Sequence, residues 1–164
     1  MLWATRHNPH VDRCASAWLI KRFIDKKARF AFISKDDPIP RGAIAFTLPK
    51  AEIKPIEKKK TTYDVLIEKY KINDPAVLEL AKIVRAADTD KVETVSEAAG
   101  LEAIMTGIGT VAKDDHEAIE KARLVYDALY TNCKLKLVRD KHKDEIEKMD
   151  RKQRREFLKK KLTE

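Results

Sequence analysis

Apolar residues change their spacing along the chain at residue 61. Before that point they form short runs of aromatic and β-branched residues that end at turn residues such as Asn8-Pro9. Such runs are typical of strands, and we predict three, over residues 2–5, 29–34 and 42–49. A helical repeat lies between the first two runs, because apolar positions recur every three or four residues from Ala15 to Ile24.

From residue 61 onwards, the apolar residues recur at helical spacing. The starts of these helices are marked by side chains that can accept hydrogen bonds from the first free N–H groups. Thr61 or Thr62 is expected to cap a helix that ends at Tyr70, and Asp74 followed by Pro75 marks the next start. We predict helices over residues 63–70, 75–88 and 96–111, and a longer one that begins at Asp114.

These elements predict an α+β fold: a mostly helical single domain with a small N-terminal sheet and a basic helical C-terminal tail. The 164 residues are enough to bury a core without disulfide bonds. Charge divides the chain into a body, residues 1–133, and a tail, residues 134–164. The tail holds 13 Lys and Arg against 7 Asp and Glu, whereas the body holds 22 against 20. Nucleic acid is therefore not expected on the body, and the tail is where nucleic acid or a second copy of the chain could bind.

Several protein classes are excluded by what the sequence lacks. No apolar run reaches the roughly 18 to 20 residues of a membrane span, and no signal peptide is recognised, so we expect a cytoplasmic protein without membrane contact. Cys14 and Cys133 do not have the spacing of a zinc site. Both are expected to be small buried residues, but Cys14 would have a lowered pKa and a redox role if it lay at the helix start beside Arg13.

Unusual chemistry gathers where the first strand meets the first helix. Arg6, His7, His10, Asp12 and Arg13 lie within eight residues, and Asp12 is expected to be the N-cap of the helix. One interpretation is only structural, a helix cap with surface histidines and an ion pair. A second is an oxyanion cradle that uses the two arginines and the free N–H groups of the helix start. A third is a metal site built from histidine and carboxylate ligands.

Two further polar groups follow in the helical part. Asp88 continues the apolar face of its helix, and Asp90 follows directly, so these carboxylates could cap, form salt bridges or bind a metal. A second polar seam lies beside the apolar stripe of the longest helix and contains His116, Arg123, Asp127 and Tyr130. The first helix also carries Cys14, Trp18, Lys21 and Arg22 opposite its apolar face, and the tryptophan indicates that this side is covered by another element or lines a cleft.

Five segments carry a family resemblance: Trp18-Leu-Ile-Lys-Arg-Phe-Ile-Asp25, Ile83-Val-Arg-Ala-Ala-Asp-Thr-Asp90, Glu97-Ala-Ala-Gly-Leu101, Asp114-Asp-His116 and Tyr126-Asp-Ala-Leu-Tyr130. Together, and in this order, they are similar to the chromate-resistance domain. This domain forms the C-terminal part of the ChrB-type chromate-sensing regulators and also occurs alone or beside rhodanese domains. The resemblance covers residues 1–133 and implies a cytoplasmic protein connected to chromate or a related stress response.

We therefore expect a sensor or accessory protein of the chromate-resistance type that binds a small oxyanion or a metal ion. The expected ligand-binding residues are Arg6, Arg13, Trp18, Arg22, Arg123 and Tyr130. The metal alternative would take a divalent transition metal on His7, His10, Asp12, Asp88, Asp90, His116 and Asp127.

Two other functions remain open at this point. The order of the histidine and aspartate groups loosely resembles DHH-type phosphoesterases, which would make the protein a metal-dependent hydrolase of phosphoesters. The other is a non-catalytic interaction module, with a tail that forms a homodimer or docks electrostatically. The sequence does not decide whether the protein is an enzyme.

Overall fold

Three parallel strands form a small sheet near the N-terminus. The computed structural model describes residues 1–56, 60–89 and 94–163, and within them the strands are β1 (Leu2–Arg6), β2 (Arg29–Ile33) and β3 (Ile44–Ala45). β1 lies in the middle, with Trp3 opposite Phe30 on one side and Ile44 on the other. The first two predicted strands are confirmed.

The third strand is shorter than predicted. Only Ile44 and Ala45 form a regular strand, although Phe46 still donates its N–H to the carbonyl of Ala4 at 2.9 Å. The prediction of a strand over 42–49 was wrong because Thr47 has a left-handed backbone, with φ 54°, which ends the extended conformation. The chain then turns, and Thr47 donates its N–H to the carbonyl of Ile53 at 2.8 Å.

The first helix starts one turn after the sheet and has a different cap from the one predicted. α1 (Val11–Leu19) continues as a π-helical turn, η1 (Ile20–Ile24). Its N-cap is His10, whose side chain makes no capping hydrogen bond. The prediction that Asp12 caps α1 was wrong, because Asp12 lies inside the first turn and its carboxylate caps another helix.

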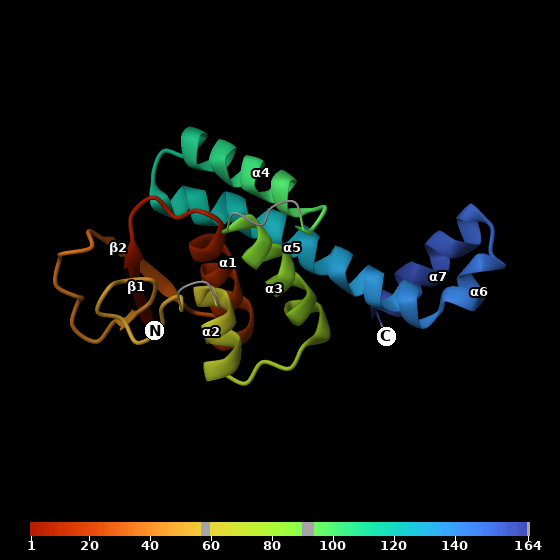
Figure 1. Cartoon of the computed structure of the whole chain (residues 1–164), viewed down its shortest axis with the longest axis horizontal. Coiled ribbons are helices and arrows are strands. Elements are labelled where there is room, and N and C mark those ends of the chain that lie inside the picture. Colours follow the sequence, from red (N-terminus) through yellow and green to blue (C-terminus); the bar gives the residue numbers. More distant parts are fainter. Residues whose placement is uncertain (57–59, 90–93, 164) are drawn as a thin grey trace.

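The remaining helices of the body begin within two residues of their predicted starts. α2 (Thr62–Lys69) begins with a capping box between Thr61 and Asp64, and α3 (Pro75–Ala87) has Asp74 as its N-cap. α4 (Ala98–Val111) lies along α5 (Asp115–Lys141), which has Asp114 as its N-cap (Figure 1). α5 covers the side of α1 that carries Trp18, which is only 3% exposed.

One main core joins the sheet to the helices. Its largest fully buried side chains include Trp3 of β1, Tyr63 of α2 and Tyr126 of α5. A smaller apolar cluster, made of Ala4, Leu48 and Ala51, also forms against β1. α1 contacts α2, α3, α4 and α5, so this helix is the centre of the body.

The tail continues from the far end of α5. α6 (Lys143–Glu147) and α7 (Arg151–Thr163) fold back against that end, away from the sheet (Figure 1). The predicted boundary between body and tail falls inside α5, which is continuous to Lys141. Within the described part of the chain, no helix is both long and apolar enough to cross a membrane.

Candidate functional site

The arginine and histidine residues near the N-terminus lie at the carboxyl end of the central strand. The strand order β2-β1-β3 places the two later strands on opposite sides of β1, so the end of β1 is a point where the direction of winding reverses. Open α/β sheets bind ligands at such points. Arg6 ends β1, and Asn8, with φ 54°, turns the chain into α1. We call Arg6, Asn8, Asp12, Arg13 and Asp88 the switch-point corner.

Arg6 and Arg13 are two cations of this corner that no carboxylate neutralises directly. Neither guanidinium forms an ion pair among the residues that the structure describes. Arg13 is half-buried and donates from Nη2 to the carbonyl of Asn8 at 2.5 Å, while its buried Nε has no acceptor in the described part. Burial, followed by the charge of Arg6, lowers the pKa of Arg13. The corner therefore holds a guanidinium group with unused hydrogen-bonding capacity.

Asp12 connects the corner to α2. Its carboxylate is 5% exposed and accepts from the N–H groups of Thr62 and Tyr63, each at 2.9 Å. These are two of the free N–H groups at the start of α2. Burial raises the pKa of Asp12, while the two backbone hydrogen bonds act in the opposite direction. Asp12 is thus a buried structural cap that fixes α2 against α1.

Asp88 brings a second carboxyl group to the same place. It follows α3 as the C-cap residue, and its Oδ1 accepts from the backbone N–H of Asp12 at 3.4 Å. Desolvation and then the nearby charge of Asp12 raise its pKa to about 6. The predicted neighbour Asp90 lies outside the described residues. The structure therefore brings Asp12 and Asp88 together, and Asp88 can change its charge near neutral pH.

The histidines of the predicted metal set have separate partners. His7 pairs through Nδ1 with Asp115 Oδ2 at 2.8 Å, and His10 Nε2 lies 3.2 Å from the hydroxyl of Thr106. The His116 ring meets the ring of Phe32 edge-on at 4.9 Å. Over residues 1–56, 60–89 and 94–163, no group of three or more His, Cys, Asp or Glu side chains is placed to hold a metal ion.

The other predicted ligand residues form a second network around Asp127 of α5. Its carboxylate accepts from the Trp18 indole at 2.9 Å, from Arg22 at 2.8 Å and from Arg123 at 3.1 Å. The Arg22 guanidinium also lies 4.8 Å from the centre of the Tyr130 ring, and Tyr130 donates to Asp74 at 2.7 Å. This network joins η1 and the end of α1 to α5, whereas the switch-point corner lies at the start of α1. The predicted ligand set is therefore divided between two places, and Asp127 already offsets the charges in the second.

The cysteines are not activated thiols. Both are free and buried. Burial raises the pKa of Cys14 to about 12 and that of Cys133 to about 11. The alternative of a lowered pKa at Cys14 is contradicted, because desolvation outweighs the charge of the adjacent Arg13. The prediction that both are buried core residues is confirmed.

Two residues at the corner were not in the predicted set. Asp115 binds both His7 and the N–H of Asn8, the latter through Oδ1 at 2.9 Å. Asn8 supplies the carbonyl that holds Arg13. The sequence contained one signal for Asp115, since Asp114 and Asp115 are adjacent and only one of them can be the N-cap of α5.

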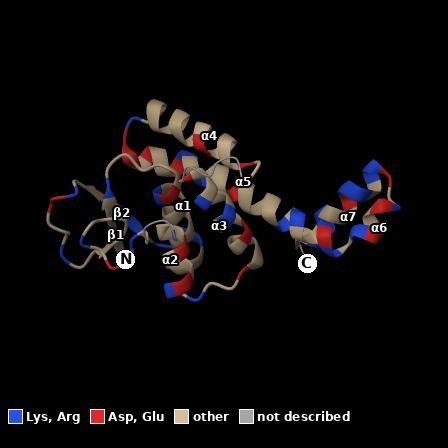
Figure 2. Cartoon of the chain, viewed as in Figure 1, with Lys and Arg blue, Asp and Glu red and all other residues tan. Residues whose placement is uncertain are grey.

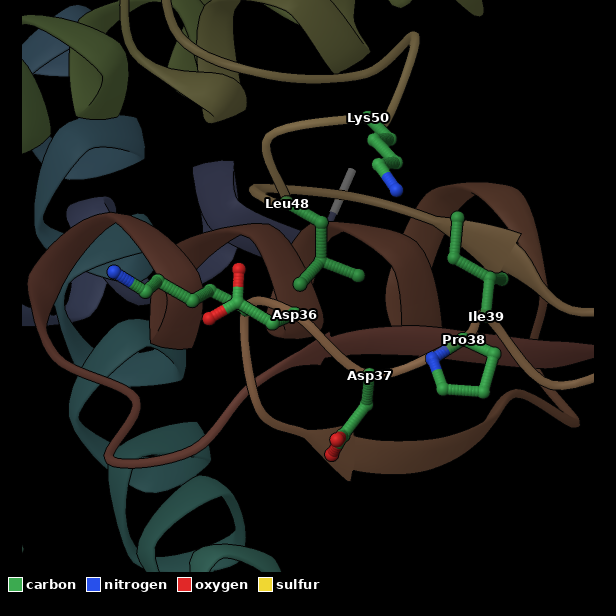
Figure 3. Close-up of a pocket in the computed structure, with 7 residues that line it drawn as sticks. Asp36, Asp37, Pro38, Ile39, Leu48 and Lys50 are labelled. Atoms are coloured by element: carbon green, nitrogen blue, oxygen red, sulfur yellow. The ribbon is translucent and has the colours of Figure 1, made fainter.

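The clearest hollows on the surface lie elsewhere. One of about 330 Å³ is lined by the loop after β2 and by Leu48 and Lys50 (Figure 3). Another of about 390 Å³ lies between α3 and α5 and includes Cys133. Neither is lined by Arg6 or Arg13. A ligand at the switch-point corner would therefore lie outside both of these hollows.

The fold and the corner together define an α+β domain in which helices share a core with a short parallel sheet and two arginines lie near the end of the central strand. Comparison with known proteins gives its family. Residues 3–133 match the family model described as ChrB, C-terminal domain. The chain belongs to this family, which confirms the resemblance seen in the sequence.

A curated relative supports the assignment. Protein ChrB of Cupriavidus metallidurans is 31% identical over 131 residues, which are 79% of this chain and 40% of that protein. The chain thus spans less than half the length of this relative. No solved structure matches the chain.

Proposed function

We propose that this domain binds a small tetrahedral oxyanion at the switch-point corner, as a cytoplasmic sensing or accessory unit of the chromate-resistance type. The observation that carries the proposal is the arginine pair. The charge of Arg6 lowers the pKa of Arg13 by more than the charge of either Asp12 or Asp88 raises it, and neither arginine forms an ion pair with a described carboxylate. Two adjacent cations repel each other, and a bound dianion would offset that repulsion.

The hydrogen-bonding groups of the corner suit such a ligand. Guanidinium groups bind oxyanions through parallel N–H donors, and the exposed guanidinium of Arg6 donates no hydrogen bond to the described residues. The start of α1 adds partial positive charge, although one of its first N–H groups, that of Asp12, already donates to Asp88. Membership in the ChrB C-terminal domain family makes chromate the first anion to test, with sulfate as an analogue of the same shape.

The test compares ligand-induced stabilisation of the wild type and of an Arg13→Ala variant in chromate, sulfate and phosphate. Binding to the folded state alone adds about 2.7 kcal/mol of stability at one hundred times Kd, which appears as a rise in Tm. We expect Arg13→Ala to lose this rise. Arg29→Ala is the matched control, because Arg29 is exposed at the other end of the sheet. Equal stabilisation of wild type and Arg13→Ala would contradict the proposal.

A second measurement separates an oxyanion from a metal ion. The measurement is an elemental analysis of protein that has been purified without a histidine tag or chelator. We expect it to find no stoichiometric transition metal. A near-stoichiometric metal that is lost in His7→Ala or Asp12→Asn would replace the oxyanion proposal with the metal alternative.

A further inference from the structure

The helix α7 is strongly basic and lies outside the residues that match the family. Its sequence Arg-Lys-Gln-Arg-Arg-Glu-Phe-Leu-Lys-Lys-Lys-Leu-Thr has seven basic residues and one acidic residue among 13. Figure 2 shows this concentration of Lys and Arg at the end of the molecule opposite the sheet. The charge of the tail is therefore carried mainly by one helix.

The apolar side of α7 is already occupied. Leu158 is 7% exposed where α7 contacts α5, and the Phe157 ring lies 5.3 Å from the ring of His142. Arg154 donates to the carbonyls of Ile146 and Met149, at 3.4 and 3.3 Å, and so ties α7 to the end of α6. These contacts hold α7 in one orientation.

The opposite side of α7 presents unpaired cations. Lys152, Arg155 and Lys159 are exposed and lie within about 60° of one another at 100° per residue. None of the three forms an ion pair with a described carboxylate. Some cations of the body differ, since Lys21 pairs with Glu120 and Arg22 with Asp127. Glu156 is also exposed and lies about 40° from Lys152, so the cationic face of α7, defined as Lys152, Arg155 and Lys159, keeps a net positive charge among the described residues.

We propose that this cationic face docks on the phosphate backbone of double-stranded nucleic acid. A membrane fits less well, because a helix that lies in a membrane surface inserts an apolar face, and α7 uses its own against α5 and His142. Single strands fit less well, since they bind by stacking bases on aromatic rings, and Phe157 is the aromatic residue of α7. A row of cations without aromatic rings can neutralise the phosphates of a duplex but has no group on which single-stranded bases stack.

The docking is independent of base sequence. Base edges are read by side-chain amides or by bidentate arginines inside a groove. Gln153 is the amide side chain of α7, and its carbonyl already accepts from the N–H of Asp150 at 3.0 Å. Contacts of Lys and Arg with phosphates position a protein on a duplex but carry no sequence information.

The experiment uses the full chain and a fluorescent DNA duplex of about 20 base pairs, with fluorescence anisotropy read between about 50 and 200 mM salt. A variant with Lys152→Gln, Arg155→Gln and Lys159→Gln removes the cationic face and keeps good helix formers. The charge-matched control carries Lys26→Gln, Lys27→Gln and Arg29→Gln, which are exposed on the body. Circular dichroism and urea unfolding check that both variants fold.

Three phosphate contacts predict a slope of log K against log salt of about −3 for the wild type. We expect the α7 variant to bind at least about tenfold more weakly at low salt with a slope near zero, and the control to change less than about twofold. The proposal is overturned if the two variants bind equally, or if the wild type binds vesicles with phosphatidylserine but not the duplex. Arg13→Ala is expected to keep duplex binding, so this test is independent of the oxyanion site.

Discussion

At the scale of single residues, Asp12 shows how a carboxylate can serve an element other than its own. Its sequence position before an apolar repeat is typical of an N-cap. In the structure its oxygens bind the N–H groups of Thr62 and Tyr63, 50 and 51 residues away. Local pattern correctly marked Asp12 as a capping residue, but the helix that it caps is chosen by packing.

Asp88 is the residue whose charge should affect stability near neutral pH. Its pKa in the folded protein is about 6, above the ordinary aspartate value of 3.8, so the folded state binds this proton more tightly than the unfolded state. Its contribution to stability is therefore fully present below pH 4, declines as pH rises through 6, and is absent at pH 7.

We expect Asp88→Asn to be more stable than the wild type at pH 7 and similar to it near pH 4. The gain should be about 1 kcal/mol or less, because Asp88 is more than a third exposed and solvent screens its charge. Urea unfolding at both pH values measures the difference. Asp140→Asn, on an exposed position of α5, is the control and should show no such pH dependence. If Asp88→Asn were less stable than the wild type at pH 7, the raised pKa of Asp88 would be contradicted.

At the scale of elements, α1 is packed on two sides. Its apolar face meets the core beneath the sheet, and its opposite side meets α5 through Trp18 and Arg22. Asp127 is the acceptor for both side chains, so this one carboxylate joins the two helices. The prediction that another element covers Trp18 is confirmed, and the polar seam of α5 is what it meets.

We expect Asp127→Ala to destabilise the protein by about 1–3 kcal/mol, because the Trp18 indole and the two guanidinium groups lose their acceptor. Glu120→Ala is the matched control on the same helix. It removes only the exposed pairs with Lys21 and Arg123 and should change stability by about 0–1 kcal/mol. Urea unfolding gives both values. Equal losses in the two variants would show that Asp127 is no more than a surface ion-pair partner.

At the scale of the whole molecule, α5 is shared by the body and the tail. Leu137 packs against the main core, and Lys136 pairs with Glu79 of α3, although both follow the predicted boundary at Cys133. Beyond Lys141, Ile146 and Leu158 are buried among the tail helices and the end of α5. The core of the body should therefore depend on α5 up to Lys141 and not on α6 or α7.

Two truncations test this division. A chain that ends at His142 should unfold in urea within about 1 kcal/mol of the full chain, because the tail covers little of the main core. In a chain that ends at Cys133, the free energy of unfolding should fall further, by about 1–2 kcal/mol. This is roughly what the burial of part of a leucine side chain contributes. Equal stability of the two truncated chains would place the boundary at Cys133, and unfolding of both would make the tail part of the domain.

The sequence by itself determined the features that depend on neighbouring residues. The starts of α2, α3 and α5 follow from Thr61, Asp74 and Asp114, because a cap and the N–H groups that it binds lie within three residues. Helical spacing likewise predicted the helices α2, α3, α4 and α5. The class of fold and the family followed from these local patterns and motifs.

Only the tertiary structure decided which distant groups meet. It paired Asp12 with α2, brought Asp88 beside Asp12, and left Arg6 and Arg13 without carboxylate partners among the described residues. It also divided the expected ligand residues between two ends of α1. The reason is physical: a side chain's partner and pKa depend on burial and on charges brought close by packing, and neither is encoded in sequence spacing.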